Sequence, residues 1–238
     1  MKKTFCTVLF IVIYTLSFSQ APKKEEPKKT KEDDEFHIKK YKGEPGDRLI
    51  IEVNRTIWVG QPSDIKTNWR SLGMNFAFMF DKPIGHSSFS FGYGIGIFSH
   101  NYHSNANFIY QLDSLNKTVK TVLQPKTIPY TTNSYNEKIL EIPFEIRFRS
   151  KTDRKFKMEL GAKAGYVIND FRKMVDGDGK IRVYNTKNIN HFRYGLNFRI
   201  GVEQICFTAC YYVSEVFQKN KGVNGINMLS FGIAIIPY

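Results

Sequence analysis

The chain has 238 residues, 15% of them aromatic, and a formal net charge of +13 at pH 7. This length fits one domain, or one domain with a tail. The basic residues are not gathered into one run or helix face, so the charge does not indicate a nucleic-acid-binding protein, and no nucleic-acid partner is expected.

The segment Met1–Ser19 predicts a secretory signal peptide. Two lysines near the start precede the short apolar run Phe5–Phe18, and small residues end the segment before Gln20. The alternative is a transmembrane anchor, but about 14 apolar residues are too few to span a bilayer comfortably. Export is therefore expected, and any further membrane residence must come from strands.

Residues 20–47 form a charged stretch with almost no apolar pattern. Within Ala21–Asp47, eight Lys stand against eight Asp or Glu. Such a segment cannot bury enough apolar surface to offset its ordering entropy, so we predict a disordered periplasmic tail. It is either a solvated spacer or a secondary contact for a partner or a cell-wall polymer.

From residue 48 to residue 238 the apolar residues recur with a period of two, which is typical of strands. An even number of strands of about 10 residues, joined alternately by short turns and long loops, describes a transmembrane β-barrel. The sequence therefore predicts an all-β fold, an eight-stranded antiparallel transmembrane β-barrel, from the segments Arg48–Val59, Trp69–Phe80, Ser87–Ser99, Lys138–Arg149, Lys155–Ile168, His191–Glu203, Ile205–Phe217 and Ile226–Ile236.

The apolar face of these segments is expected to face lipid. In the third segment, Phe89, Phe91, Tyr93, Ile95 and Ile97 share one face, and glycines and serines share the other. The rival is a soluble secreted barrel that binds an apolar ligand inside. An eight-stranded barrel is only just filled by its inward side chains, and about forty large apolar residues exceed that space.

The connections fit the same interpretation. Asp81–His86 and Ser150–Arg154 are short and contain turn residues, whereas Asn101–Glu137 and Asn169–Asn190 are long loops. Barrels of this class place short turns in the periplasm and long loops outside the cell. Pro143 removes a ladder donor within the fourth segment, so we expect a bulge there.

Charged residues on the inward face form the strongest constellation. A charge in a narrow lumen must be paired or hydrated. Mixed signs on neighbouring strands predict a salt-bridge network that plugs the barrel, with a proton path or narrow polar channel as the alternative. The expected members are Glu52, Glu141, Glu145, Arg147, Arg149, Lys157, Glu159, Lys163, Arg193, Arg199 and Glu203.

Histidines near the loop end support an enzyme hypothesis. His100, His103 and His191 fall near the ends of the third and sixth segments, with Ser99 and Ser104 close by. A nucleophile needs a base within hydrogen-bond reach and a group that orients that base, which sequence does not show. We predict no enzyme and no cofactor, with a catalytic site at the rim as the alternative.

Two further motifs favour structural roles. Asp176–Gly179 resembles part of a calcium loop but lacks the ligand spacing and the closing Glu, so a turn is expected. Cys206 and Cys210 lie roughly 13 Å apart along one strand, too far for a disulfide, and are expected to line the lumen.

The loop Asn101–Glu137 is the longest connection and contains five aromatic residues among Asn and Ser. Exposed aromatics with small polar neighbours suit the binding of a protein or a glycan, although they could equally pack against the barrel rim. We expect this loop to carry the main recognition surface through Tyr102, Phe108, Tyr110, Tyr130 and Tyr135.

The eight-strand layout, the Ser-Phe-Ser-Gln end of the signal and the closing segment LSFGIAIIPY resemble the small outer-membrane β-barrel proteins of the Bacteroidota, the broad family that includes PorT-like proteins. The resemblance covers Arg48–Tyr238. It implies that the barrel-insertion machinery reads the last strand, with Phe231 and Tyr238 as the signal, although Pro237 interrupts the alternation. Some PorT-like barrels are implicated in type IX secretion. The resemblance thus implies a structural or partner-binding role in the envelope, with outer-membrane lipid and another envelope protein as partners.

Overall fold

The computed structural model describes residues 49–113, 117–151 and 156–237. The predicted signal peptide, the predicted tail and Tyr238 lie outside the described residues. No helix within the described residues is long and apolar enough to cross a membrane. The strands are β1 Leu49–Val59, β2 Leu72–Pro83, β3 Phe89–His103, β4 Ala106–Asp113, β5 Thr118–Pro125, β6 Thr132–Arg149, β7 Phe156–Val175, β8 Lys180–Tyr184, β9 Phe192–Val202, β10 Ile205–Glu215 and β11 Asn227–Ile235.

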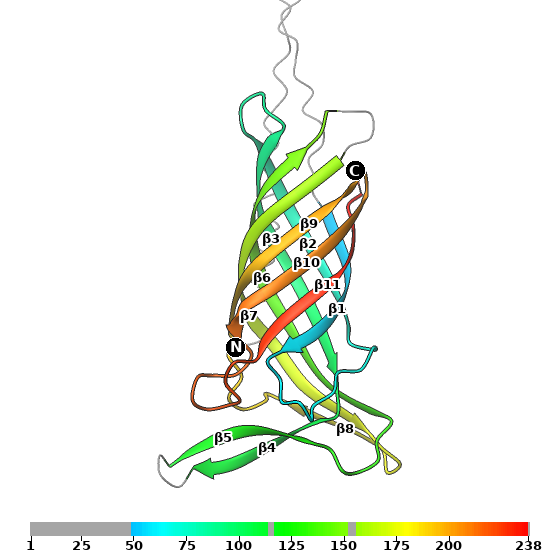
Figure 1. Cartoon of the computed structure of the whole chain (residues 1–238), viewed down its shortest axis with the longest axis vertical. Coiled ribbons are helices and arrows are strands. Elements are labelled where there is room, and N and C mark those ends of the chain that lie inside the picture. The colour runs from blue at the N-terminus through cyan, green and yellow to red at the C-terminus, as the bar shows by residue number, and fades with distance from the viewer. Residues whose placement is uncertain (1–48, 114–116, 152–155, 238) are drawn as a thin grey trace, which may run out of the picture. The chain divides into compact units, whose positions relative to one another are not determined.

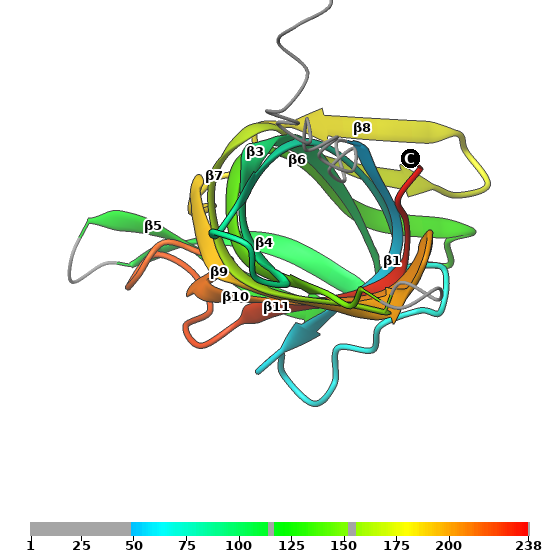
Figure 2. The same cartoon turned by 90° about the horizontal axis from the view of Figure 1, so that it is seen from above.

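Eight of these strands close into a ring, in the order β1, β2, β3, β6, β7, β9, β10, β11 (Figures 1 and 2). Every pairing is antiparallel, and the first and last strands join from Ile51↔Ile235 to Val59↔Asn227. A closed ring leaves no strand edge unpaired, which lipid requires. The predicted eight-stranded antiparallel barrel is confirmed.

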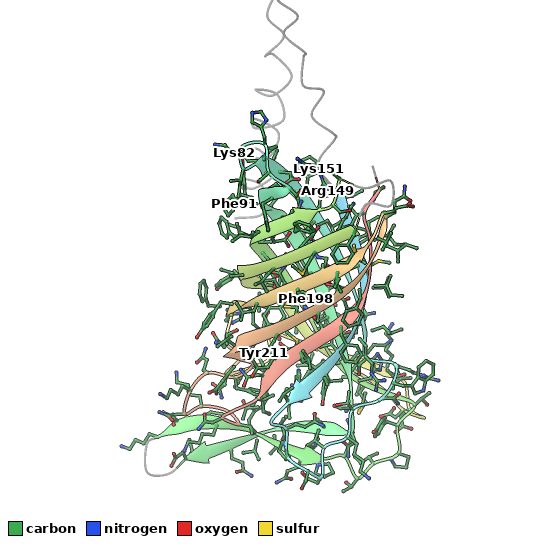
Figure 3. The ribbon with its side chains drawn as sticks, turned by 45° about the horizontal axis from the view of Figure 1, so that its top comes forward. Lys82, Phe91, Arg149, Lys151, Phe198 and Tyr211 are labelled. Carbon is green, nitrogen blue, oxygen red and sulfur yellow. The ribbon has the colours of Figure 1, made fainter. Side chains whose placement is uncertain are left out.

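The apolar side chains face outward. On β2, Phe76, Phe78 and Phe80 are each about half exposed, at 47%, 47% and 50%. Figure 3 shows Phe91 on the outer surface, with Lys82, Arg149 and Lys151 gathered at the short-turn end. This orientation contradicts the soluble-barrel alternative, because that fold would enclose its apolar face.

Glycine on the inward face makes room for long charged side chains. Gly92 of β3 packs against Arg147 of β6, and a Cβ at residue 92 would lie 2.5 Å from the Arg147 Nε. Long inward side chains such as those of Arg147, Lys157 and Arg193 are fully buried, as expected for an eight-stranded barrel whose side chains fill the lumen.

The long connections are not plain loops, contrary to expectation. Asn101–Glu137 contains the end of β3, the hairpin β4–β5 and the start of β6, and Asn169–Asn190 contains the end of β7 and β8. The hairpin pairs in register from Ala106↔Pro125 to Asp113↔Thr118. Because β3, β6 and β7 continue past the apolar belt, their mutual pairing orders the polar segments that follow them.

The bulge predicted at Pro143 is wrong. Pro143 pairs in register with Lys163, and its missing N–H only interrupts the ladder with β3 between Tyr93↔Phe144 and Gly96↔Glu141. The register shift lies instead where β6 residues 138 and 139 face β7 residues 169 and 167. The extra residue, Ile168, changes which β7 side chains point into the lumen.

Candidate functional site

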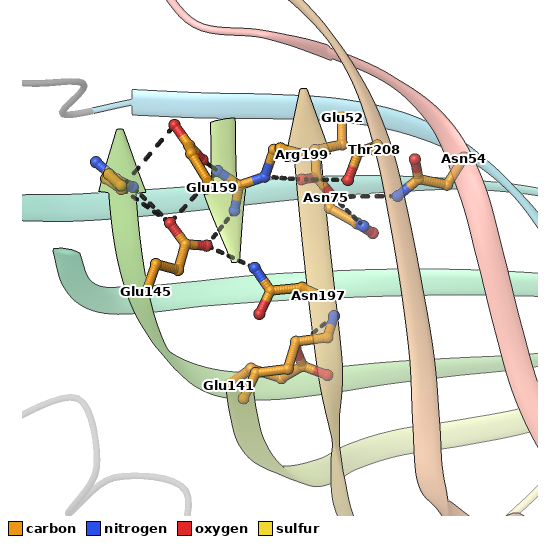
Figure 4. Close-up of polar contacts among 11 residues, drawn as sticks. Glu52, Asn54, Asn75, Glu141, Glu145, Glu159, Asn197, Arg199 and Thr208 are labelled. Carbon is orange, nitrogen blue, oxygen red and sulfur yellow. Dashed lines mark hydrogen bonds and ion pairs between the residues drawn. The ribbon is translucent and has the colours of Figure 1, made fainter. Parts of the chain in front are cut away.

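Arg199 of β9 is the centre of the ion network in the lumen (Figure 4). Its Nε lies 3.0 Å from Glu52 Oε1, and its terminal nitrogens contact Glu145 and Glu159. These carboxylates come from β1, β6 and β7, so one guanidinium links four strands across the barrel. A planar guanidinium suits this position because its donors point in several fixed directions.

Neighbouring groups satisfy the same carboxylates. Arg147 donates to Glu145 over 2.8 and 2.9 Å, and Asn197 donates to Glu145 over 2.8 Å. Another carboxylate of this layer, Glu52, accepts hydrogen bonds from Asn54, Asn75 and Thr208 at 3.1, 2.9 and 3.2 Å. Buried ions are tolerated when paired and hydrogen-bonded in this way.

A second layer surrounds Lys163. Its ammonium lies 2.9 Å from Glu141 and sits over the rings of Phe98 and Tyr212, 4.1 and 4.6 Å from their centroids. The Tyr212 hydroxyl donates to Glu141 and lies 3.1 Å from His100 Nε2. One cation thus has an ion pair and two aromatic faces, an arrangement that stabilises a desolvated ammonium.

A third layer lies nearer the loop end. Arg193 pairs with Glu137 at 2.9 Å and donates to the carbonyl of Glu215 at 2.9 Å. The Tyr135 hydroxyl donates to Glu137 over 3.0 Å. Glu137 was missed from the sequence because the predicted segment began at Lys138, although the inward alternation of β6 continues to it.

The structure brings most of the predicted lumen residues together. Arg149 lies at the short-turn end of the inward face, half-buried and 3.4 Å from Asp81. Glu203 is exposed in the β9–β10 turn with a φ of 54°, so its assignment to the lumen is wrong. Buried inside the barrel are Glu52, Glu141, Glu145, Arg147, Lys157, Glu159, Lys163, Arg193 and Arg199.

An aromatic cluster covers the charged layers at the loop end. Trp58 stacks on Tyr102 with ring centroids 3.9 Å apart, and the rings of Phe108, Tyr135 and Phe217 lie 5.8–6.3 Å from that of Trp58. All five side chains are buried. They form the aromatic cluster Trp58, Tyr102, Phe108, Tyr135 and Phe217, which closes the mouth of the lumen.

This cluster corrects the predicted recognition surface. Tyr102, Phe108 and Tyr135 are buried, so they pack the loop against the barrel and offer nothing to a partner. Tyr110 is half-buried beside the guanidinium of Arg172, and Tyr130 remains exposed. The alternation of β3 already pointed Tyr102 inward.

The hairpin β4–β5 crosses the loop end of the barrel (Figure 1). The Thr121 amide donates to the Lys221 carbonyl over 2.8 Å, and Asn188 donates to the Val119 carbonyl over 2.8 Å. At the base of the hairpin, the Lys126 amide donates to the Asn105 carbonyl over 2.8 Å. The hairpin is therefore bound to the loops on the other side of the mouth.

The histidines do not share a site. His100 lies in the lumen with its Nδ1 3.1 Å from the Thr56 hydroxyl, while His191 stacks on Tyr166 with ring centroids 5.7 Å apart. The third, His103, lines a pocket on the outside of the barrel.

The remaining candidates are the Asp176–Gly179 motif, the two cysteines and Phe231, and each lies in an ordinary element of the fold. Asp176 Oδ1 accepts the amides of Asp178 and Gly179, which makes a turn between β7 and β8. Cys206 and Cys210 are buried, not disulfide-bonded and on the lumen face. Phe231 is half-buried on β11.

Comparison with known proteins identifies the family. The family model described as outer membrane protein beta-barrel domain matches residues 36–214, about three quarters of the chain. No curated protein and no solved structure matches. With its closed ring, its apolar outer face and this match, the chain belongs to the outer membrane protein β-barrel domain family, whose place is the bacterial outer membrane.

Proposed function

We propose that the protein is a closed, non-conducting and non-enzymatic barrel that binds a partner at its loop end. The observation that carries the proposal is the filled lumen. Three layers of ion pairs, centred on Arg199, Lys163 and Arg193, are followed by the aromatic cluster and the hairpin β4–β5. With the wall facing lipid and the lumen occupied, the loop end is the surface with room for a partner.

The channel alternative is tested by conductance. The full-length protein, reconstituted in a planar bilayer, is expected to give no steady current, because ions would have to displace paired charges in a lumen that eight strands barely leave open. A large porin measured in the same bilayer is the positive control. A stable single-channel conductance would overturn the closed-barrel proposal.

The partner-binding role is tested by removing the hairpin. Asn105 and Lys126 are hydrogen-bonded neighbours, so residues 106–125 can be replaced by a short turn without moving the ends of the ring. We expect the variant to insert normally, shown by heat-shifted gel mobility, and to lose its cellular role. A folded variant that retains full activity in cells would refute the binding role of the hairpin.

The enzyme alternative is addressed by the histidines. Because His100, His103 and His191 lie in three different surroundings, their joint replacement by asparagine is expected to leave the cellular phenotype intact. Loss of the phenotype in a variant with normal heat-shifted mobility would support catalysis.

The finer assignment within the proposal is a PorT-like barrel that serves a secretion or envelope assembly. It rests on the eight-strand layout and the closing segment Leu229–Tyr238. Affinity purification of the intact protein from native membranes tests it. Reproducible recovery of an envelope protein together with the barrel supports this assignment. If the same protein is recovered with the variant that lacks the hairpin, the partner binds at a site other than the hairpin.

A further inference from the structure

A polar pocket of about 310 Å³ lies at the loop end, outside the lumen. It is formed by the β1–β2 loop, the end of β3 and the connection from β5 to β6. Its lining includes Lys66, Arg70, His103, Asn105, Tyr130 and Asn133. This volume is at the lower end of the range for small-molecule sites, which are typically about 300–1,000 Å³.

The pocket lies just beyond the apolar belt, on the outer wall. The outward side chains of β3 are apolar as far as Ile97, and the outward positions that follow are Ser99, Asn101 and His103. Next to Arg70, the side chain of Trp69 is 68% exposed. Aromatic residues of this kind mark the interface between hydrocarbon and headgroups. With the long loops outside the cell, as in barrels of this class, that interface is the one with the headgroups of the outer leaflet.

The pocket carries positive charge that the described residues do not neutralise. Lys66, Arg70 and the nearby Lys173 form no ion pair with any described residue. Partial burial, together with the cations of Lys173 and Arg70, lowers the pKa of His103, which lies above the apolar belt. The imidazole is therefore neutral near pH 7 and available as a hydrogen-bond partner beside two cations.

The surrounding loop end is also basic. At the loop end, the segments between the ring strands carry ten Lys or Arg residues against four Asp, so the local field attracts anions. The cations are Lys66, Arg70, Lys117, Lys120, Lys126, Lys180, Arg182, Lys187, Lys219 and Lys221, and the acids are Asp64, Asp113, Asp176 and Asp178.

Hydrogen bonds from two asparagines hold the walls of the pocket in place without a ligand. Asn105 accepts the Lys66 amide over 2.7 Å and donates to the Asp64 carbonyl over 2.9 Å. Asn133 donates to the carbonyls of Ser104 and Ala106 over 2.8 and 2.7 Å. A pocket whose frame is hydrogen-bonded before binding needs little further ordering to hold a ligand.

We propose that this pocket binds the phosphorylated saccharide headgroup of an outer-leaflet glycolipid. Lys66 and Arg70 supply the cations for a phosphate, since charge-assisted hydrogen bonds to phosphate are among the strong ones. His103 and Tyr130 line the same space, and an imidazole and a phenol match the hydroxyl groups of a sugar as hydrogen-bond partners. The site differs from the proposed partner surface, because it faces the membrane and requires no second protein.

The test uses the full-length protein in detergent and a matched pair of double variants. K66A/R70A removes two cations of the pocket, whereas K219A/K221A removes two cations from the β10–β11 connection, where neither residue lines the pocket. The probes are diphosphorylated lipid A, the same lipid without phosphates, and glucose 1-phosphate. Binding is measured by native mass spectrometry, and the His103 pKa by NMR titration.

Diphosphorylated lipid A is expected to bind the wild-type protein and to raise the His103 pKa, since an anion beside the imidazole favours its charged form. K66A/R70A should weaken binding at least tenfold, and K219A/K221A less than twofold. Equal losses in the two variants would show general charge attraction and overturn the site. Equal binding of the lipid without phosphates would overturn the phosphate role. Stronger binding of glucose 1-phosphate than of lipid A would show that the ligand is a free sugar phosphate and would overturn the proposal of a glycolipid.

Discussion

Replacing Arg199 by methionine removes the cation that joins four strands inside the barrel. At 3.0 Å from Glu52, one charge pair has a Coulomb attraction of about 5.5 kcal/mol at an effective dielectric constant of about 20. The substitution leaves Glu145 and Glu159 with Arg147, but Glu52 loses the cation that it contacts. Truncating one partner of a buried network typically costs about 3–5 kcal/mol, and we expect R199M to fall in this range.

The free energy of unfolding can be measured in urea, in lipid vesicles, from tryptophan fluorescence. R149M is the matched control, because Arg149 pairs with Asp81 at 3.4 Å at the partly exposed rim, where ion pairs contribute about 0–1 kcal/mol. The double variant E52Q/R199M should lose about 0.5–3 kcal/mol less than the sum of its single changes. If R199M destabilises the barrel no more than R149M does, the network around Arg199 does not hold the strands together.

Three further outcomes follow from the same structure. G92A should destabilise the barrel by about 1–3 kcal/mol, measured by urea unfolding, because the added methyl group must displace the Arg147 side chain; no loss would show that this side chain moves freely. W58A should cost about 3–5 kcal/mol and lower the temperature of the heat-shifted gel transition, yet the bilayer should still carry no steady current, because the ion-pair layers below remain; a current would assign closure to the aromatic cluster alone. An epitope tag inserted between Asp113 and Thr118, which pair at the tip of the β4–β5 ladder, should be accessible to antibody on intact cells; labelling only after the outer membrane is breached would reverse the topology.

The period-two pattern was sufficient to predict the ring and its orientation. Outward residues such as Met74 and Phe76 have inward neighbours that are small or polar, and lipid imposes this separation along each strand. The pattern could not locate the register shift. In the sequence, Ile168 is one more apolar residue in a strand. In the structure it is the extra residue of a bulge, so the inward positions on either side of it are Val167 and Asp170, three residues apart instead of two.

The candidate site was predictable where strands have neighbours on both sides and not where they end. Glu145 and Arg199 lie in the middle of paired strands, so alternation alone placed them inside. Glu203 continues the alternation by number, but the chain turns at that residue and its side chain leaves the lumen. The burial of Phe108 depends on the β4–β5 hairpin folding back over the mouth, which no local pattern records.

The pairing of β1 with β11 makes the folding of this barrel depend on both ends of the ring. Its contacts join Ile51 to Ile235, among the most distant pairs in the sequence, and such contacts form slowly because the loop entropy must be lost first. A chain that ends before Asn227 would keep two unpaired strand edges in the lipid, where hydrocarbon offers no hydrogen-bond partner to the free N–H and C=O groups. Synthesis must therefore be almost complete before the barrel can seal.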